Sequence, residues 1–270
     1  MATEGWDRLL APAWSGCLGR GVPQAGAGAR REPRRVPRRA AIGEPASVAC
    51  VKAVVVAHGE VDPGDVAHVR GADLVIAADG GTLHLEAWGT LPHLVVGDLD
   101  SLPPEARDRL VAAGGRVELH PREKDKTDTE IAVDRAVALG ADEVVIVGAL
   151  GGPRIDHAIA NTLLLAGRAD ALIRLVRGPM SMRLLRGGER LELTGSEGEV
   201  VTLLAIGGDA LEVRTSGLRY PLTGETLRLG SSRGVSNEIA APPASVGLGT
   251  GALLVIEGGA LPPRQPEPKA

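Results

Sequence analysis

The stretch that decides the fold is LVIAADGG, residues 74–81, in which a short apolar run stops at Asp-Gly-Gly. Three more apolar runs reach glycine in the same way: CVKAVVVAHG at 50–59, LPHLVVGDLDS at 91–101 and EVVIVGALGG at 143–152. The stretches from Glu130 to Leu139 and from Ile155 to Ala166 have helical character. Continuous apolar strands that alternate with helices are typical of a parallel sheet covered on both faces. We therefore predict an α/β domain over residues 50–170, with strands at 74–78, about 93–96 and 143–147.

The chain changes character after about residue 172, where the helical stretches stop. Short strand-like runs follow at close spacing, with Gly-rich turns between them: IRLV, MRLLR, RLEL, VVTLLAI, LEVRT and LLVIE. Such spacing is typical of an all-β module, either a sandwich or a barrel. We predict a C-terminal β-sandwich domain over residues 171–260, a domain boundary near 168–172 and a disordered tail at 261–270.

Residues 1–49 differ from both predicted domains. They are rich in Gly, Pro and Arg, contain RREPRRVPRR at 30–39 and show no apolar periodicity. We expect a disordered extension. An Arg-rich organelle-targeting segment is the alternative, although the density of Pro and Gly argues against the amphipathic helix that it needs.

Charge and motifs exclude several classes of function. The 270-residue chain has a net charge of −4, and residues 1–49 hold eight Arg against four acidic residues, which leaves −8 for the rest. A globular part with this much negative charge is not expected to bind nucleic acid, because the phosphate backbone is also negative. We see no apolar run of 18 residues and no secretory signal, so we expect no membrane span and a cytoplasmic location. The two cysteines lack metal-binding spacing, and no Walker-type phosphate loop, dinucleotide-binding GxGxxG or GxSxG motif follows a strand.

Asp98 and Asp100 are the sharpest feature of the sequence. They follow the predicted strand at 93–96 and lie two residues apart, so both carboxylates can turn toward one point. Ligands of open parallel sheets bind outside the carboxyl ends of the strands, and Mg²⁺ takes one or two carboxylates together with substrate phosphates. The pair therefore indicates a Mg²⁺ site. A solvated Asp turn is the structural alternative.

A second acidic group lies in KDKTDTE, residues 124–130. Thr127 with Glu130 fits a capping box, which predicts the start of a helix. Asp128 then falls in the first helical turn, where the helix dipole favours negative charge. This structural role is sufficient by itself. The functional alternative is that Asp125 and Asp128 face the same metal–phosphate site as the first acidic pair.

A third group is GGPRIDH, residues 151–157, which leads into a predicted helix. Arg154 can bind a phosphate through two N–H groups. Asp156 is a candidate N-cap, and His157 is either a base or a histidine of the capping turn without a catalytic task. Acids, glycines and an arginine at strand ends together indicate metal-assisted phosphoryl chemistry.

Five motifs, taken in this order, resemble those of the thiamine pyrophosphokinase family. They are ADGG at 78–81, LPHLVVGDLDS at 91–101, DKTDTEIAV at 125–133, GGPRIDHAIAN at 151–161 and GLRYPLTGETLRLGSSRGVSNE at 217–238. The resemblance covers about residues 52–257. It implies an ATP-binding α/β domain and a thiamine-binding β-sandwich, in a homodimer whose active site is shared between subunits. It also implies the reaction, in which the hydroxyl of thiamine attacks the β-phosphorus of ATP with Mg²⁺ as cofactor and AMP leaves.

The resemblance also implies roles for individual residues. The implied catalytic acids and Mg²⁺ ligands are Asp98, Asp100 and Asp128. The implied ATP-binding residues are Asp79, Gly80, Gly81, Asp125, Thr127, Arg154 and Asp156. The implied contacts of the thiamine pyrimidine are Ser236 and Asn237. Family members often have Gln where this chain has Lys124, and some place an aromatic ring against the pyrimidine, for which this chain offers one Tyr, three Trp and no Phe.

Two rival classes of function stay open beside this one. The first is a pyrophosphokinase or kinase that acts on another hydroxymethyl heterocycle. The second is a non-catalytic module that binds a nucleotide or thiamine. Four acids beside a triphosphate argue against the second class, because a pure binder has little need for them.

Overall fold

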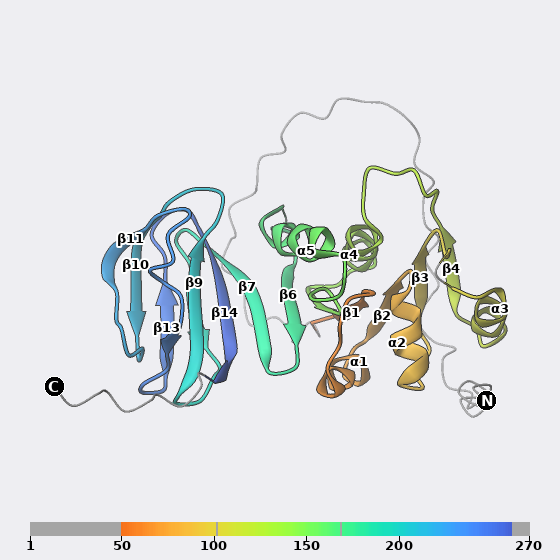
Figure 1. Ribbon diagram of the computed structural model, residues 1–270, viewed down its shortest axis with the longest axis horizontal. Helices are drawn as coiled ribbons and strands as arrows, with labels where there is room; N and C mark the ends of the chain where they lie inside the picture. The colour runs from red at the N-terminus through yellow and green to blue at the C-terminus, as the bar shows by residue number, and fades with distance from the viewer. Residues whose placement is uncertain (1–49, 101, 168, 261–270) are drawn as a thin grey trace, which may run out of the picture.

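The computed structural model describes residues 50–100, 102–167 and 169–260 (Figure 1). The extension predicted at 1–49 and the tail predicted at 261–270 lie outside the described residues. The first half of the described chain forms β1 (Lys52–Val56), η1 (Pro63–Asp65), α1 (Val66–Arg70), β2 (Leu74–Ala78), α2 (Gly81–Ala87), β3 (Leu94–Gly97), α3 (Pro104–Ala112), β4 (Arg116–Leu119), α4 (Asp128–Ala138), β5 (Glu143–Val147) and α5 (Ile155–Gly167). The second half forms β6 (Leu172–Arg177), β7 (Met180–Arg186), β8 (Arg190–Leu193), β9 (Glu199–Ala205), β10 (Ala210–Ser216), β11 (Thr223–Leu227), β12 (Asn237–Glu238), β13 (Ala244–Gly247) and β14 (Ala252–Ala260).

The first half builds a parallel sheet in the order β6-β5-β1-β2-β3-β4. Its central strands are apolar on both faces because helices cover both. On one face, Val55 and Ile146 pack with α4 and with Leu165 of α5. On the other face, Val54 and Val145 pack with residues of α1, α2 and α3. Figure 1 shows α4 and α5 on the side of the sheet opposite α1 and α2.

The same sheet continues into the second half without a break. β7 pairs antiparallel with β6, and β14, β9 and β12 follow, so that ten strands share one hydrogen-bonded ladder. A second sheet, β11-β10-β13-β8, packs against this end. Alternate residues of the two sheets form the core between them, such as Val201 and Leu253 on one side and Val213 and Val246 on the other. This end of the molecule is therefore a β-sandwich.

The junction between the two halves is held by charged groups as well as by the ladder. The carboxylate of Asp65, which is 1% exposed, accepts hydrogen bonds from the backbone N–H of Asp62 at 2.9 Å and of Gly178 at 2.8 Å. Gly178 lies in the turn between β6 and β7, and Arg177 beside it forms ion pairs with Glu60 and Asp62. These contacts fasten the turn to the loop that follows β1.

The predicted fold class, α/β followed by a β-sandwich, is confirmed. The predicted strands at 74–78 and 143–147 coincide with β2 and β5. The boundary near 168–172 stays a prediction, because β6 pairs with both β5 and β7 and the sheet shows no gap there. Among the described residues, no helix is long and apolar enough to cross a membrane.

Candidate active site

The first part of the site is the turn that follows β2, formed by Asp79, Gly80 and Gly81. Asp79 has a φ of 44°, in the left-handed region, and its backbone N–H donates to the carbonyl of Val96 at 2.8 Å, which ties this turn to β3. A Cβ on Gly81 would lie 1.9 Å from the carbonyl oxygen of Val56, and one on Gly80 would lie 2.2 Å from a ring nitrogen of His58. Gly81 is thus required by the close approach of β1 and α2, whereas a side chain at Gly80 would have to displace the ring of His58. Their role as ATP contacts stays a prediction.

The end of β3 carries the two acids that the sequence singled out. Gly97 and Leu99 have φ values of 149° and 59°, so the chain turns sharply after the strand. Leu99 is buried in the core, while Asp98 and Asp100 flank it on the outside. The backbone N–H of Asp100 donates to Asp98 Oδ1 at 3.2 Å, which holds the turn. A left-handed Leu is strained, and the burial of its side chain offsets that cost.

Three carboxylates converge at this edge of the sheet. One oxygen from each of Asp79, Asp98 and Asp100 lies within 4.8 Å of the others. Asp79 Oδ1 is buried and has no hydrogen-bond partner. Mutually repelling carboxylates with an unsatisfied buried oxygen fit a hard divalent cation such as Mg²⁺. Asp79 joins the expected Asp98 and Asp100 in this group, and Asp128 as a metal ligand stays a prediction.

Asp128 lies at the start of α4. Thr127 caps this helix, accepting the backbone N–H of Glu130 at 3.2 Å, as the sequence predicted. A Cβ on Gly97 would lie 3.3 Å from Asp128 Oδ1, so this carboxylate borders the end of β3. The same oxygen forms an ion pair with Lys124 Nζ at 3.0 Å. The geometry of this contact is not that of a hydrogen bond, so Asp128 Oδ1 has no hydrogen-bond partner among the described residues. Asp125 is exposed on the loop before the helix.

The Gly-rich loop before α5 lies beyond the end of β5. Gly151 and Gly152 have φ values of 77° and 80°, which favour glycine at both positions. Arg154 and Asp156 form an exposed ion pair at 2.7 Å, and hydrogen bonding from Arg154 lowers the pKa of Asp156 to about 2. Asn161, also in α5, is buried and donates to the carbonyl of Ala149 at 2.9 Å, which ties the helix to the loop. His157 is exposed in the first turn of α5.

The two residues expected to contact thiamine lie in the sandwich. Ser236 is exposed and has a φ of 60°. Asn237 is buried, and its amide holds the backbone of Tyr220: Oδ1 accepts the N–H at 3.0 Å and Nδ2 donates to the carbonyl at 2.8 Å. Asn237 Oδ1 also accepts the N–H of Glu238 at 2.9 Å. Asn237 therefore fixes the segment that carries Tyr220, a residue that is 54% exposed.

Replacing Asn237 by Ala is expected to lower the free energy of unfolding by about 2 kcal/mol, because the buried Asn237 amide and the part-buried backbone groups of Tyr220 lose their hydrogen bonds. The shift in the urea unfolding midpoint measures this loss. Ser236→Ala, a change at the exposed neighbouring hydroxyl, is the matched control and should stay within about 0.5 kcal/mol. Equal shifts for both variants would contradict a specific role for the Asn237 amide.

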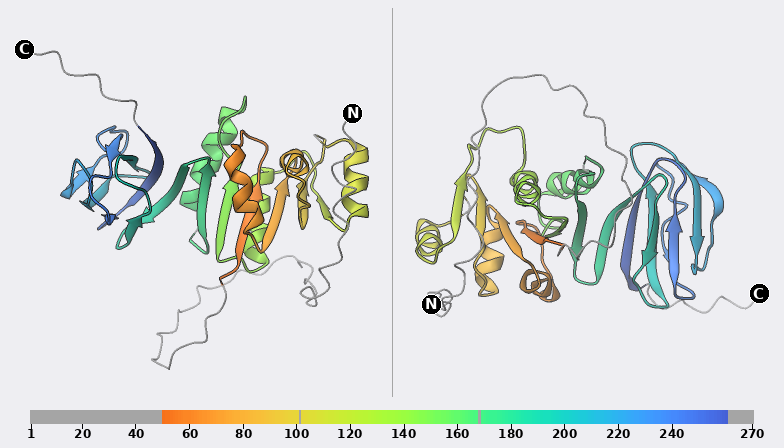
Figure 2. Two further views of the ribbon diagram at one scale, coloured as in Figure 1. Left: turned by 90° about the horizontal axis from the view of Figure 1, so that it is seen from below. Right: turned by 180° about the vertical axis from the view of Figure 1, so that it is seen from behind.

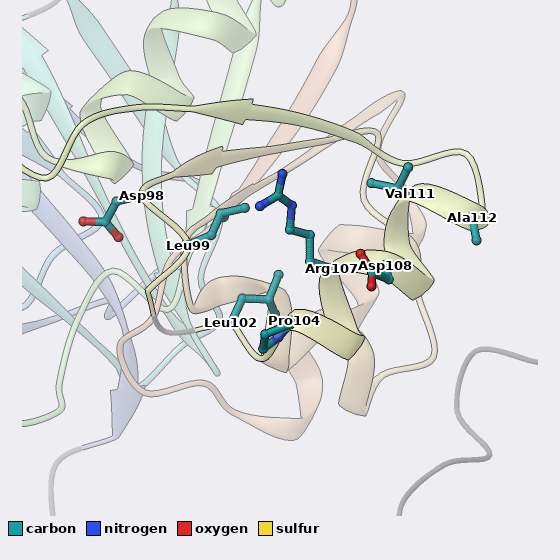
Figure 3. A pocket seen from close by; sticks show the side chains of 8 residues that line it. All are labelled: Asp98, Leu99, Leu102, Pro104, Arg107, Asp108, Val111 and Ala112. Carbon is teal, nitrogen blue, oxygen red and sulfur yellow. The ribbon is translucent and has the colours of Figure 1, made fainter.

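A shallow cavity of about 550 Å³ opens beside the acids. It is lined by Asp98, Leu99, Leu102, Pro104, Arg107, Asp108, Val111 and Ala112. Figure 3 shows Asp98 at one end of this cavity and Asp108 and Val111 of α3 at the other. The cavity could not be predicted from the sequence, because α3 buries only Ala106 and Leu110 and so shows little apolar periodicity.

The two parts of the expected site lie far apart within one chain. Eight strand-to-strand steps separate β12, which carries Asn237, from β3, which precedes Asp98. At about 4.8 Å per step, the separation along the sheet is roughly 38 Å. The view from behind shows the sandwich and the α3 end of the sheet at opposite ends of the molecule (Figure 2). ATP and thiamine are both much shorter than this separation.

A carboxyl-end edge with convergent acids is typical of enzymes that hold a divalent cation against phosphate groups. Comparison with known proteins narrows this class. The family model "Thiamin pyrophosphokinase, catalytic domain" matches residues 67–175, and "Thiamin pyrophosphokinase, vitamin B1 binding domain" matches residues 189–253. The chain belongs to the thiamine pyrophosphokinase family.

Individual relatives agree with this assignment. The thiamine pyrophosphokinase of Bacillus subtilis (strain 168) is 29% identical over 185 residues, which are 68% of this chain and 86% of that protein. Its crystal structure superposes with a TM-score of 0.70 and 28% identity, covering 78% of this chain and 100% of that one. The crystal structure of thiamin pyrophosphokinase from Geobacillus thermodenitrificans gives a TM-score of 0.68 at 30% identity, covering 77% and 98% of the two chains.

Proposed function

We propose that this chain transfers the terminal diphosphate of ATP to the hydroxyl of thiamine, giving thiamine diphosphate and AMP. The observation that carries the proposal is the convergence of Asp79, Asp98 and Asp100 within 4.8 Å at the carboxyl edge of the sheet. Similar chains from two bacteria, which the sequence spans almost completely, are named thiamine pyrophosphokinases.

Asp79, Asp98 and Asp100 are the residues that would hold Mg²⁺. The buried and unpartnered Asp79 Oδ1 supports this assignment, because a cation would satisfy it. Mg²⁺ would supply positive charge against the polyphosphate as charge shifts in the transition state. Asp128 as a further metal ligand is part of the proposal, since its carboxylate borders Gly97.

The ATP polyphosphate would lie along the starts of α4 and α5. Backbone N–H groups at a helix N-terminus bind anions, and both helices begin beside the acidic edge. Thr127 and Asp125 border the first of these positions, and Arg154 with Asp156 borders the second. Holding the β-phosphorus in line with the attacking hydroxyl supplies most of the rate in such reactions.

A second copy of the chain would complete the site. Ser236 and Tyr220 cannot reach a ligand held by Asp98 of the same chain across roughly 38 Å of sheet. A two-fold dimer resolves this, because each sandwich then faces the acidic edge of the other chain. Tyr220 offers an exposed ring for the flat pyrimidine of thiamine, and Asn237 holds it in place.

Incubation of the protein with ATP, Mg²⁺ and thiamine should release AMP together with thiamine diphosphate in equal amounts, as measured by ion-exchange chromatography. The same incubation with a hydroxymethylpyrimidine in place of thiamine is the control, and should release little AMP. ADP as the product would identify a kinase, and preference for the pyrimidine would identify another pyrophosphokinase. If no alcohol yields a product, the remaining interpretation is a non-catalytic module that binds a nucleotide or thiamine.

A further inference from the structure

Lys124 is the most deeply placed cation at the acidic edge. Its side chain is 14% exposed, and its Nζ lies 3.0 Å from Asp128 Oδ1, whose side chain is 25% exposed. Lysine is rarely buried to this extent unless a partner balances its charge. Long, flexible ammonium side chains on loops normally extend into water, so this one is held where it lies by Asp128.

The ion pair borders the acidic triad. A Cβ on Gly97 would lie 3.0 Å from Asp79 Cβ and 3.3 Å from Asp128 Oδ1, so the side chains of Asp79 and Asp128 begin and end, respectively, beside the same point of the backbone. The ammonium of Lys124 is thus set beside a group of four carboxylates. Arg122 also approaches the group, but it lies 3.9 Å from Asp100 and is 85% exposed, where water and salt screen its charge.

Four carboxylates disfavour a polyphosphate, and one divalent cation offsets only part of their charge. We infer that Lys124 is a positioning residue of the proposed reaction: its ammonium holds Asp128 against the end of β3 and lowers the negative charge of the edge, so that ATP can bind beside its metal ion. The inference rests on the proposed function for its substrate and on the geometry of Lys124 for its mechanism.

Removal of this charge has a signature that loss of structure lacks. Without the ammonium, the acidic edge becomes more negative and binds a divalent cation more tightly in the absence of nucleotide. The same change repels a polyphosphate and weakens its binding. Disruption of the site would weaken both, so affinities that move in opposite directions identify the electrostatic role.

The test compares Lys124→Gln with Lys126→Gln. Lys126 lies two residues away and pairs with Glu130 at 3.2 Å and Asp134 at 2.6 Å, along the exposed side of α4. Both variants lose one positive charge from the same loop. Binding of Mn²⁺ to the nucleotide-free protein is measured by electron paramagnetic resonance. Binding of α,β-methylene-ATP with Mg²⁺ is measured by calorimetry at low ionic strength.

For Lys124→Gln we expect the Kd of Mn²⁺ to fall about fivefold and the Kd of the ATP analogue to rise about tenfold. Lys126→Gln should change each by less than about twofold, because screening weakens its exposed charge. Lys124→Arg should restore most of the affinity for the analogue, since it retains the charge.

Three outcomes overturn the inference: unchanged affinities in Lys124→Gln, loss of both affinities in that variant, or equal effects from Lys126→Gln. Wild-type protein that binds neither probe overturns it as well. Thiamine takes no part in these titrations. Failure of the proposed function therefore appears separately, as wild-type protein that binds both probes and forms no thiamine diphosphate.

Discussion

Asp98→Asn is expected to lower the turnover of thiamine diphosphate formation by at least about 100-fold, because the site loses a charged oxygen ligand where the transition state needs it most. The substitution preserves shape. An Asn side chain retains an oxygen that can accept the N–H of Asp100, now made at 3.2 Å, so the turn after β3 should persist. Turnover is measured at saturating ATP and thiamine over a series of Mg²⁺ concentrations.

Asp108→Asn is the matched control. Asp108 is an exposed carboxylate of α3 that lines the same cavity, at the end away from Asp98 (Figure 3). It should keep turnover within about twofold of the wild type, as expected for a surface substitution. Near-normal turnover in Asp98→Asn, with unchanged dependence on Mg²⁺ and an unchanged unfolding midpoint, would remove Asp98 from the proposed metal site.

Co-expression of Asp100→Asn chains with Tyr220→Ala chains is expected to restore activity that each variant lacks alone. In a mixed dimer with shared sites, one site combines the intact acids of one chain with the intact sandwich of the other. Each mixed dimer has one intact site of two, so purified mixed dimers should show about half of wild-type activity. Each chain carries a different affinity tag, so that tandem purification isolates the mixed dimers before the assay.

The controls for this experiment are the two variants expressed separately and a chain that carries both substitutions. If the sites are shared, a mixed dimer of the double variant with wild type has no intact site and should be inactive. If each site lies within one chain, that dimer should keep about half of the activity. A verified mixed dimer without recovered activity would mean that each site is built within one chain. The distance between Asp100 and Tyr220 would then have to be bridged by a rearrangement of the sheet, which the continuous ladder disfavours.

The central strands could be predicted from sequence because burial on both faces leaves a clear mark. β2 and β5 are apolar throughout, and their predicted ranges match the structure. β4 escaped prediction because it is an edge strand of four residues, RVEL, with both ends exposed. α3 escaped it because only two of its nine residues are buried. Both elements bury few residues, so too few apolar positions are present to form a periodic pattern.

The sequence predicts which acids belong to the site, but not how their carboxylates are arranged in space. The DxD spacing drew attention to Asp98 and Asp100, and the structure brings their carboxylates together with that of Asp79. The left-handed φ of Asp79 and its link to Val96, which turn it toward that edge, are tertiary features that no local pattern records. The pairing of Asn237 with Tyr220 spans 17 residues and two loops, and it was equally invisible.

The unbroken ladder from β4 to β12 has a mechanical consequence. Enzymes that close around a substrate often do so by rotation of two domains about a flexible connection. Here β5, β6, β7 and β14 are joined in one ladder of backbone hydrogen bonds, and Asp65 accepts a hydrogen bond from the β6–β7 turn. The two halves of the described chain are therefore connected rigidly, without a flexible hinge. Water must then be excluded, and products released, by movement of the short loops at the carboxyl edge or, in the proposed dimer, of the contact between the two chains. We therefore expect turnover that is limited by product release to respond to loop substitutions and to be unaffected by changes at the β6–β7 junction that leave it folded.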